Sequence, residues 1–163
     1  MAKCDMFLKM VGTVTGPIKG EANDQAHADE IEVAGWEWGM EGSTVTMGTA
    51  SKVTVHQIKL TKRFDRASTA IMSCVRNNEL IKSAVLTVRK AGGTEPVEYC
   101  TITLEKARIT SVIVRSSDDG GTPQLDEHIS LSCTKLTVDY RGQAEDGSSL
   151  GASTFETEIF ASH

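Results

Sequence analysis

Apolar and polar residues alternate with a period of two along most of residues 30–140. The clearest runs are 84–89, 100–105 and 129–134, where every second residue is apolar. Successive side chains of a β-strand point to opposite faces, so each run predicts a strand with one buried and one wetter face. That alternation is typical of antiparallel sheets, and it predicts an all-β protein.

In three runs the alternation slips by one residue, at positions 34–35, 56–57 and 134–135. One interpretation is a β-bulge, which restores the same face after one extra residue and bends the strand. Three long, bent strands would predict a strongly curved sheet that closes into a barrel. The other interpretation is that each run is two short strands joined by a corner. Both predict a compact β structure, namely a β-barrel of two curved, mostly antiparallel sheets.

One segment departs from the period of two and predicts a single flanking α-helix at Ser68–Asn77. Ser68 is an expected N-cap residue, and Asn77 and Asn78 follow the helix, because asparagine tolerates the left-handed conformation that ends helices. Apolar residues at helical spacing predict that one side of the helix packs over an open end of the barrel; they are Ile71, Met72, Cys74 and Val75.

Turn-forming residues separate the predicted strands. Ala91–Thr94 predicts a hairpin tip, and Ser116–Pro123 predicts a polar loop. Gly12–Ala28 and Glu41–Ser51 are predicted to be irregular, and loops of that length are often functional. After Gly142 the chain is loop-like until an expected last strand at Thr154–Phe160.

Length and charge limit the class of protein. The 163 residues predict one domain spanning 1–163. The formal net charge of −5 argues against nucleic-acid binding, which needs clustered lysine and arginine. No apolar run approaches the ~20 residues of a membrane span, and residues 1–6 lack the apolar core of a signal peptide. We therefore expect a protein made in the cytoplasm without membrane insertion, and any export without a cleavable signal peptide.

The four cysteines, Cys4, Cys74, Cys100 and Cys133, are predicted to be buried or half-buried free thiols. Two disulfides are the alternative, but a chain of this length folds without them.

Reactive chemistry has little support in the sequence. The histidines, at 27, 56, 128 and 163, do not lie at metal-ligand spacing, so neither a metal nor another cofactor is predicted. His27 and His128 each lie near carboxylates and are candidates for a general base, although mixed charge is normal at such polar positions. The Asp118–Gly121 segment lacks the ligand pattern of a calcium loop and precedes no helix. No catalytic residue is predicted.

Several segments together resemble the haemolysin-coregulated protein family (Hcp), the tube protein of the bacterial type VI secretion system. They occur in order over residues 5–140: Asp5–Lys9, Lys19–Glu21, His27–Val33, Trp36–Met40, Thr61–Lys62, Asp65–Ser68 and Leu86–Gly93. The resemblance implies two curved sheets with one helix and a homohexameric ring with a wide channel. It also implies that rings stack into a secreted tube and carry small effector proteins. The implied partners are further copies of the chain, the effectors, and the sheath and spike proteins of the apparatus.

Three places depart from the family pattern. Val11–Ile18 is longer than the usual first loop, Ala22 replaces a commoner hydroxyl residue, and the segment beyond Gly142 does not match clearly. The first and the last bear on contacts between rings.

Two candidate functional regions follow from strand alternation and the resemblance. Trp36 and Trp38 are expected to point into the core, so Glu37 between them is expected to point the other way. If that strand lines the channel, Glu37 forms a circle of carboxylates that favours cargo with a basic patch. The second region, Met40–Lys52, is expected to reach a neighbouring subunit or ring; its candidate contact residues are Met40, Glu41, Gly42, Ser43, Thr44, Val45, Thr46 and Met47.

Two other functions stay open from the residues alone. A monomeric β-barrel binding module would need a cavity lined by side chains, whereas the number of bulky apolar residues predicts a filled interior. A barrel hydrolase would need a convergent acid–base pair, which the sequence does not place.

Overall fold

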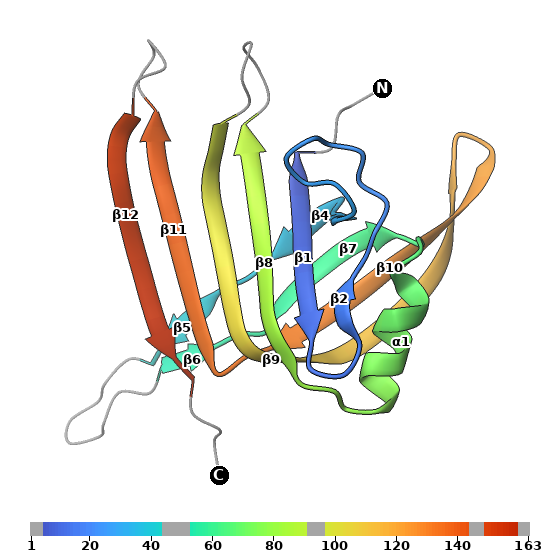
Figure 1. Ribbon diagram of the computed structural model, residues 1–163, viewed down its shortest axis with the longest axis horizontal. Helices are drawn as coiled ribbons and strands as arrows, with labels where there is room; N and C mark the ends of the chain where they lie inside the picture. Colours follow the sequence, from blue (N-terminus) through green and yellow to red (C-terminus); the bar gives the residue numbers. More distant parts are fainter. Residues whose placement is uncertain (1–4, 44–52, 91–96, 144–148, 160–163) are drawn as a thin grey trace.

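The chain folds into two β-layers that pack against each other, with one described helix at their side (Figure 1). This computed structural model describes residues 5–43, 53–90, 97–143 and 149–159. The elements are β1 (Met6–Gly12), β2 (Gly16–Ile18), β3 (Ile31–Glu32), β4 (Gly35–Glu37), β5 (Met40–Gly42), β6 (Val53–Val55), β7 (Ile58–Arg63), α1 (Ser68–Arg76), β8 (Ile81–Lys90), β9 (Val97–Asp119), β10 (Thr122–Ser132), β11 (Lys135–Gln143) and β12 (Ser149–Glu158).

Strand β9 belongs to both layers. Its first half pairs with β8 and β11, and its second half pairs with β10. The first layer therefore has the order β2-β1-β8-β9-β11-β12, and the second has the order β9-β10-β7-β4. The strand bends between the two layers near Lys106, whose φ is +49°. Every pairing is antiparallel, as the alternating pattern predicts.

The core lies between the two layers. The first layer contributes Leu8, Leu86 and Leu104, and the second contributes Leu60 and Ile129; all five are 2% exposed or less. The interior is filled by such side chains, as expected from the sequence. The predicted class, all-β with one flanking helix and two curved sheets, is confirmed. The outer strand β12 of the first layer and the outer strand β4 of the second do not pair with each other, so hydrogen bonds among the described strands leave the sheets open.

The slips at 34–35 and 134–135 are corners, whereas the slip at 56–57 is a bulge. There Glu37 lies opposite Lys59 and Met40 lies opposite Val55, so residues 56–58 face only residues 38–39, and the His56 N–H still donates to the Gly39 carbonyl at 2.9 Å. The slip at 34–35 separates β3 from β4, and that at 56–57 separates β6 from β7. The third separates β10 from β11. The two corners move the chain between layers, since β3 and β11 pair in the first layer while β4 and β10 pair in the second.

Two segments predicted to be irregular contain strands. In the Ser116–Pro123 segment, β9 and β10 continue to a two-residue turn at Gly120 and Gly121, whose φ values of +66° and +89° favour glycine. In the Gly12–Ala28 segment, Gly16–Ile18 forms β2 beside β1. The expected last strand is confirmed, but it begins at Ser149. The hairpin joining β8 to β9 is also confirmed, and its tip lies outside the described residues.

The helix is confirmed at Ser68–Arg76, but Ser68 is not its N-cap. Ala67 occupies that position without a side-chain cap, and the backbone N–H of Ala67 donates to Asp65 Oδ1 instead. Of the predicted apolar stripe, Ile71 and Cys74 are buried, whereas Met72 is exposed. Asn78 has the left-handed conformation after the helix, with φ of +50°.

Candidate channel face and contact arm

The outer face of the second layer contains Glu37, the predicted channel residue. Trp36 and Trp38 are half-buried and pack against the core, while Glu37 between them is exposed. The expected orientation of the three side chains is therefore confirmed. The role of Glu37 in a channel stays a prediction.

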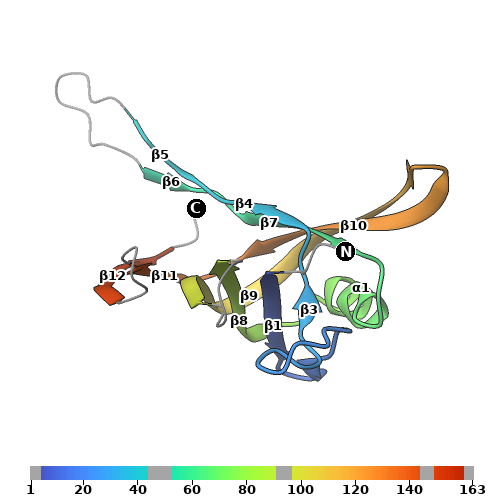
Figure 2. The same ribbon diagram turned by 90° about the horizontal axis from the view of Figure 1, so that it is seen from above.

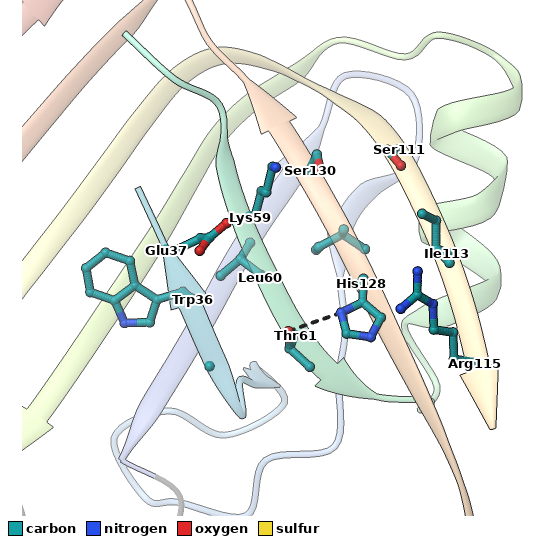
Figure 3. A pocket seen from close by; sticks show the side chains of 12 residues that line it. Trp36, Glu37, Lys59, Leu60, Thr61, Ser111, Ile113, Arg115, His128 and Ser130 are labelled. Carbon is teal, nitrogen blue, oxygen red and sulfur yellow. Dashed lines mark hydrogen bonds between the residues drawn. The ribbon is translucent and has the colours of Figure 1, made fainter. Parts of the chain in front are cut away.

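The neighbouring strands place further polar side chains on the same face. Glu37 lies opposite Lys59 of β7, and Thr61 of β7 lies opposite His128 of β10. The Thr61 hydroxyl and His128 Nδ1 are 3.2 Å apart and share a hydrogen bond. Figure 3 shows Glu37 and Lys59 close together, with Arg115 of β9 at the far side of the face.

An open groove of about 580 Å³ runs across this face. Its lining carries two cations, Lys59 and Arg115, against the single carboxylate of Glu37. The surrounding lining residues are Gly35, Trp36, Leu60, Thr61, Ser111, Ile113, His128, Ile129 and Ser130. Sequence reasoning did not find Lys59 or Arg115, because which residues share a face with Glu37 depends on strand register.

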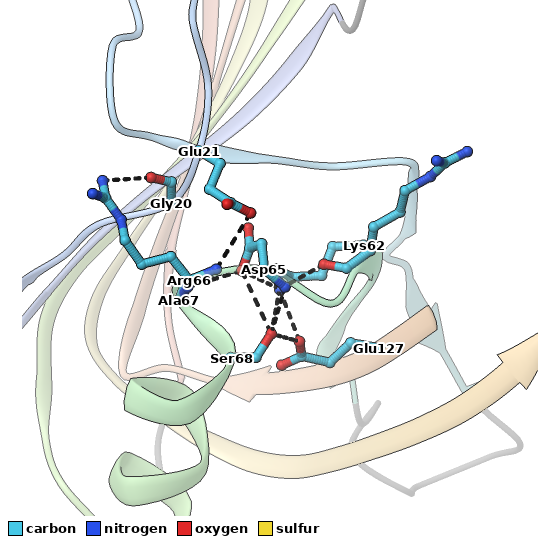
Figure 4. A network of polar contacts seen from close by, with 9 residues as sticks. Gly20, Glu21, Lys62, Asp65, Arg66, Ala67, Ser68 and Glu127 are labelled. Atoms are coloured by element: carbon cyan, nitrogen blue, oxygen red, sulfur yellow. Dashed lines mark hydrogen bonds and ion pairs between the residues drawn. The ribbon is translucent and has the colours of Figure 1, made fainter. Parts of the chain in front are cut away.

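A buried ionic network supports the face from behind (Figure 4). Lys62 Nζ donates to Glu127 Oε2 and to Asp65 Oδ1, each at 2.8 Å, and to Ser68 Oγ at 3.2 Å. The Lys62 and Glu127 side chains have no exposed surface. Because Ser68 starts α1 whereas Lys62 and Glu127 lie on β7 and β10, this network fixes the helix to the second layer.

The predicted contact arm begins as a hairpin of β5 and β6. Met40, Glu41 and Gly42 form β5, so the expectation of irregular structure is wrong at the start of the arm. All three residues and Ser43 are exposed, and among the described strands β5 pairs with β6 alone. The other candidate contact residues, Thr44, Val45, Thr46 and Met47, lie outside the described residues. Figure 2 shows that this hairpin projects from the body beyond β4 and β7.

Neither candidate histidine has the geometry of a general base. His27 is buried, is stacked on Phe7 at 4.5 Å between ring centroids, and has both ring nitrogens on carboxylates, those of Glu30 and Glu98. His27 therefore fixes the segment before β3 against β1 and β9. His128 shares its Nδ1 hydrogen bond with Thr61 and not with a carboxylate.

The described cysteines, Cys74, Cys100 and Cys133, are free thiols, as predicted. Burial raises the pKa of each, and it raises the pKa of Cys133 to about 11. Such thiols are mostly protonated at neutral pH and react slowly. Cys4 lies outside the described residues. In the described part of the chain no cluster of side chains has the make-up of a metal site, and no helix has the length and apolar character needed to cross a bilayer.

The fold defines a two-layer antiparallel β-protein with one helix at its side, and comparison with known proteins defines its family. The family model described as "Type VI secretion system effector, Hcp" matches residues 7–140. Protein Hcp1 of Pseudomonas aeruginosa is 38% identical over 151 residues, which cover 90% of this chain and 89% of that protein. The chain therefore belongs to the Hcp family of type VI secretion system proteins, and the resemblance seen in the sequence is confirmed.

Solved structures agree with this assignment. A type VI secretion system effector from Yersinia pestis superimposes with a TM-score of 0.75 at 30% identity, covering 95% of this chain and 100% of that one. Hcp1 from Salmonella typhimurium superimposes with a TM-score of 0.72 at 27% identity, covering 94% of each chain. A further type six secretion system protein has a TM-score of 0.80 at 21% identity over 96% of each chain, which shows the shared fold alone.

Proposed function

We propose that this protein is the tube subunit of a type VI secretion system. Six copies form a ring, rings stack into a secreted tube, and the channel carries small effector proteins. The function lies in the surfaces of the protein and not in a reactive site. Membership of the Hcp family supports this proposal, as does the match with the Pseudomonas aeruginosa relative over nearly its whole length.

The structural observation that carries the proposal is the open sheet. Strand β4 pairs only with β7, and β12 pairs only with β11, among the described strands. Exposed strand edges tend to pair with other chains, so a soluble protein covers or blunts them. Contacts between two different surfaces of one molecule close into a ring when the rotation between copies permits it.

The mass of the assembly tests this proposal. Sedimentation at tens of micromolar should give about six times the 17.6 kDa of one chain, and negative-stain microscopy should show rings. Interfaces of standard size are occupied at roughly such concentrations. A purely monomeric protein would contradict the proposal and would favour a monomeric binding module.

We place Glu37 on the channel wall, where each of six copies would present its carboxylate to cargo. The positive charge of the neighbouring Lys59 offsets the electrostatic field of the Glu37 carboxylate at longer distances. Glu37 therefore acts on cargo that touches the channel wall. Glu37→Arg removes no core contact, and rings should form normally while the stability or secretion of a channel-borne effector changes. Glu32→Arg, an exposed carboxylate of the first layer, is the control. Unchanged behaviour of every effector in the Glu37 variant would remove Glu37 from the cargo surface.

We place the arm that begins with β5 between stacked rings. Its exposed hairpin leaves the body on one side, so it can reach a second ring without altering its own. Replacing residues 43–52 with a two-residue turn should leave single rings intact and reduce tube length in microscopy. Tubes of normal length would show that the arm is an ordinary surface loop.

A further inference from the structure

An exposed apolar surface lies on the hairpin where β9 and β10 extend beyond the core. Phe64, Val114 and Leu125 are 39%, 38% and 49% exposed. Val114 lies two positions beyond Val112, which packs against the core, and Leu125 lies four positions before the buried Ile129. Side chains two or four positions apart share a face of a strand, so both point to the core side of the second layer. Phe64 joins them because its backbone N–H donates to the Leu125 carbonyl at 3.0 Å. We call these three residues the hairpin patch.

A second exposed apolar surface lies on the last two strands of the first layer. Tyr140 and Phe155 are 49% and 43% exposed. Phe155 of β12 lies opposite the half-buried Val138 of β11. Val138 and Tyr140 follow the buried Leu136 at intervals of two, so all these side chains continue the core face of the first layer. We call Val138, Tyr140 and Phe155 the end-strand patch.

The two patches lie at opposite ends of the molecule and in opposite layers. Both views place the turn between β9 and β10 at one end and β12 at the other (Figures 1 and 2). Each patch faces the side on which the other layer lies, but the described residues of its own molecule leave it exposed. The second layer thus extends past the first at the β9–β10 turn, whereas at the other end β5 and β6 reach as far as β11 and β12 and leave Tyr140 and Phe155 exposed (Figure 2).

We propose that the hairpin patch of one copy docks on the end-strand patch of the next copy. The two patches would then meet as the two layers meet within one chain, apolar face to apolar face, at the usual spacing of packed sheets. Because the two docking surfaces differ, a copy bound through its hairpin patch still has its end-strand patch free for a further copy. This inference rests on the proposed ring and specifies its contact.

The area of the two patches fits the centre of such a contact. From the exposed fractions and about 150–250 Å² for a whole aromatic side chain, the patches together supply on the order of 400 Å² of apolar surface. A standard interface buries about 1,600 Å² in total, with an apolar centre and a polar rim. Large side chains in that centre dominate the binding energy, so Leu125 and Phe155 are the residues to change.

Two single substitutions, Leu125→Glu and Phe155→Glu, each place a charge in one patch. Each variant alone should sediment as a monomer, with association weakened about 30-fold or more. Val14→Glu is the matched control, since Val14 is 86% exposed on the turn between β1 and β2; it should form rings as the unaltered protein does. Circular dichroism checks the fold, and the milder Leu125→Asn and Phe155→Asn replace any variant that does not fold.

A one-to-one mixture of the two variants is the decisive measurement. The Phe155 variant keeps an intact hairpin patch, and the Leu125 variant keeps an intact end-strand patch. The mixture should therefore form dimers and no larger species. A monomeric mixture, or rings formed by either variant alone, would overturn the docking arrangement. The hexamer proposal would then still depend on the mass measured for the unaltered protein. If the unaltered protein itself is monomeric, both proposals fall.

Discussion

Replacing Lys62 with methionine should destabilise the protein strongly, because it leaves a buried carboxylate without its cation. Glu127 has no exposed surface, and among the described residues its Oε1 has no hydrogen-bond partner even in the intact network. Without Lys62, the remaining contact of the carboxylate in this network is with the Ser68 hydroxyl. Removing one partner of a buried ion pair costs about 3–5 kcal/mol. At roughly 2–4 °C per kcal/mol for a chain of this size, the melting temperature should fall by about 6–20 °C.

The double variant Lys62→Met, Glu127→Met separates the loss of the pair from the loss of packing. With both charges gone, Asp65 still accepts from Ala67, and Ser68 still accepts from the Asp65 backbone N–H. Replacing a buried ion pair by apolar side chains of similar volume is often neutral or stabilising. The double variant should therefore be more stable than either single variant.

Urea unfolding followed by circular dichroism gives these free energies, at one protein concentration because assembly changes apparent stability. A loss below about 1 kcal/mol for Lys62→Met would refute the reasoning, since it would mean that water or another group compensates the Glu127 carboxylate. Equal losses in the single and double variants would assign the effect to packing.

Two further predictions concern titratable groups. Hydrogen bonds, first from the Thr15 backbone N–H, lower the pKa of Glu79, so its contribution to stability is present above the unfolded pKa and is lost as the pH falls through the folded pKa. The stability difference between the unaltered protein and Glu79→Gln should shrink as the pH falls from about 5 to 3, and a difference that stays constant in urea titrations would contradict this. Burial raises the pKa of Cys133 to about 11 from 9.0, so its labelling by a thiol reagent at pH 8 should be on the order of 100-fold slower than in urea, as read by mass spectrometry. Equal rates would show that the thiol is not protected.

The sequence determined which residues face the core, because alternation along a strand is a local property. The run 100–105 has the expected one buried face, whereas in the run 84–89 Thr87 and Arg89, on the face expected to be wetter, are buried as well. The same reasoning failed for Ser116–Pro123, where the hairpin extends past the core and neither face of its last residues is buried. There the local signal for a strand is weak, and the pair of glycines at the turn was the better guide.

The tertiary structure alone decided how these strands combine. A slip in alternation is compatible with a bulge or a corner, and only the pairing of strands in the fold decides between them. Local sequence likewise does not fix the register between two strands. Only the folded structure therefore shows that Lys59 lies beside Glu37. Lys62 and Glu127 are 65 positions apart, and their contact depends on the pairing of β7 with β10. The sequence by itself thus determined the β class, the direction of Glu37 and the family. The folded chain decided which charges meet and where apolar surface is left uncovered, because these depend on contacts between distant segments.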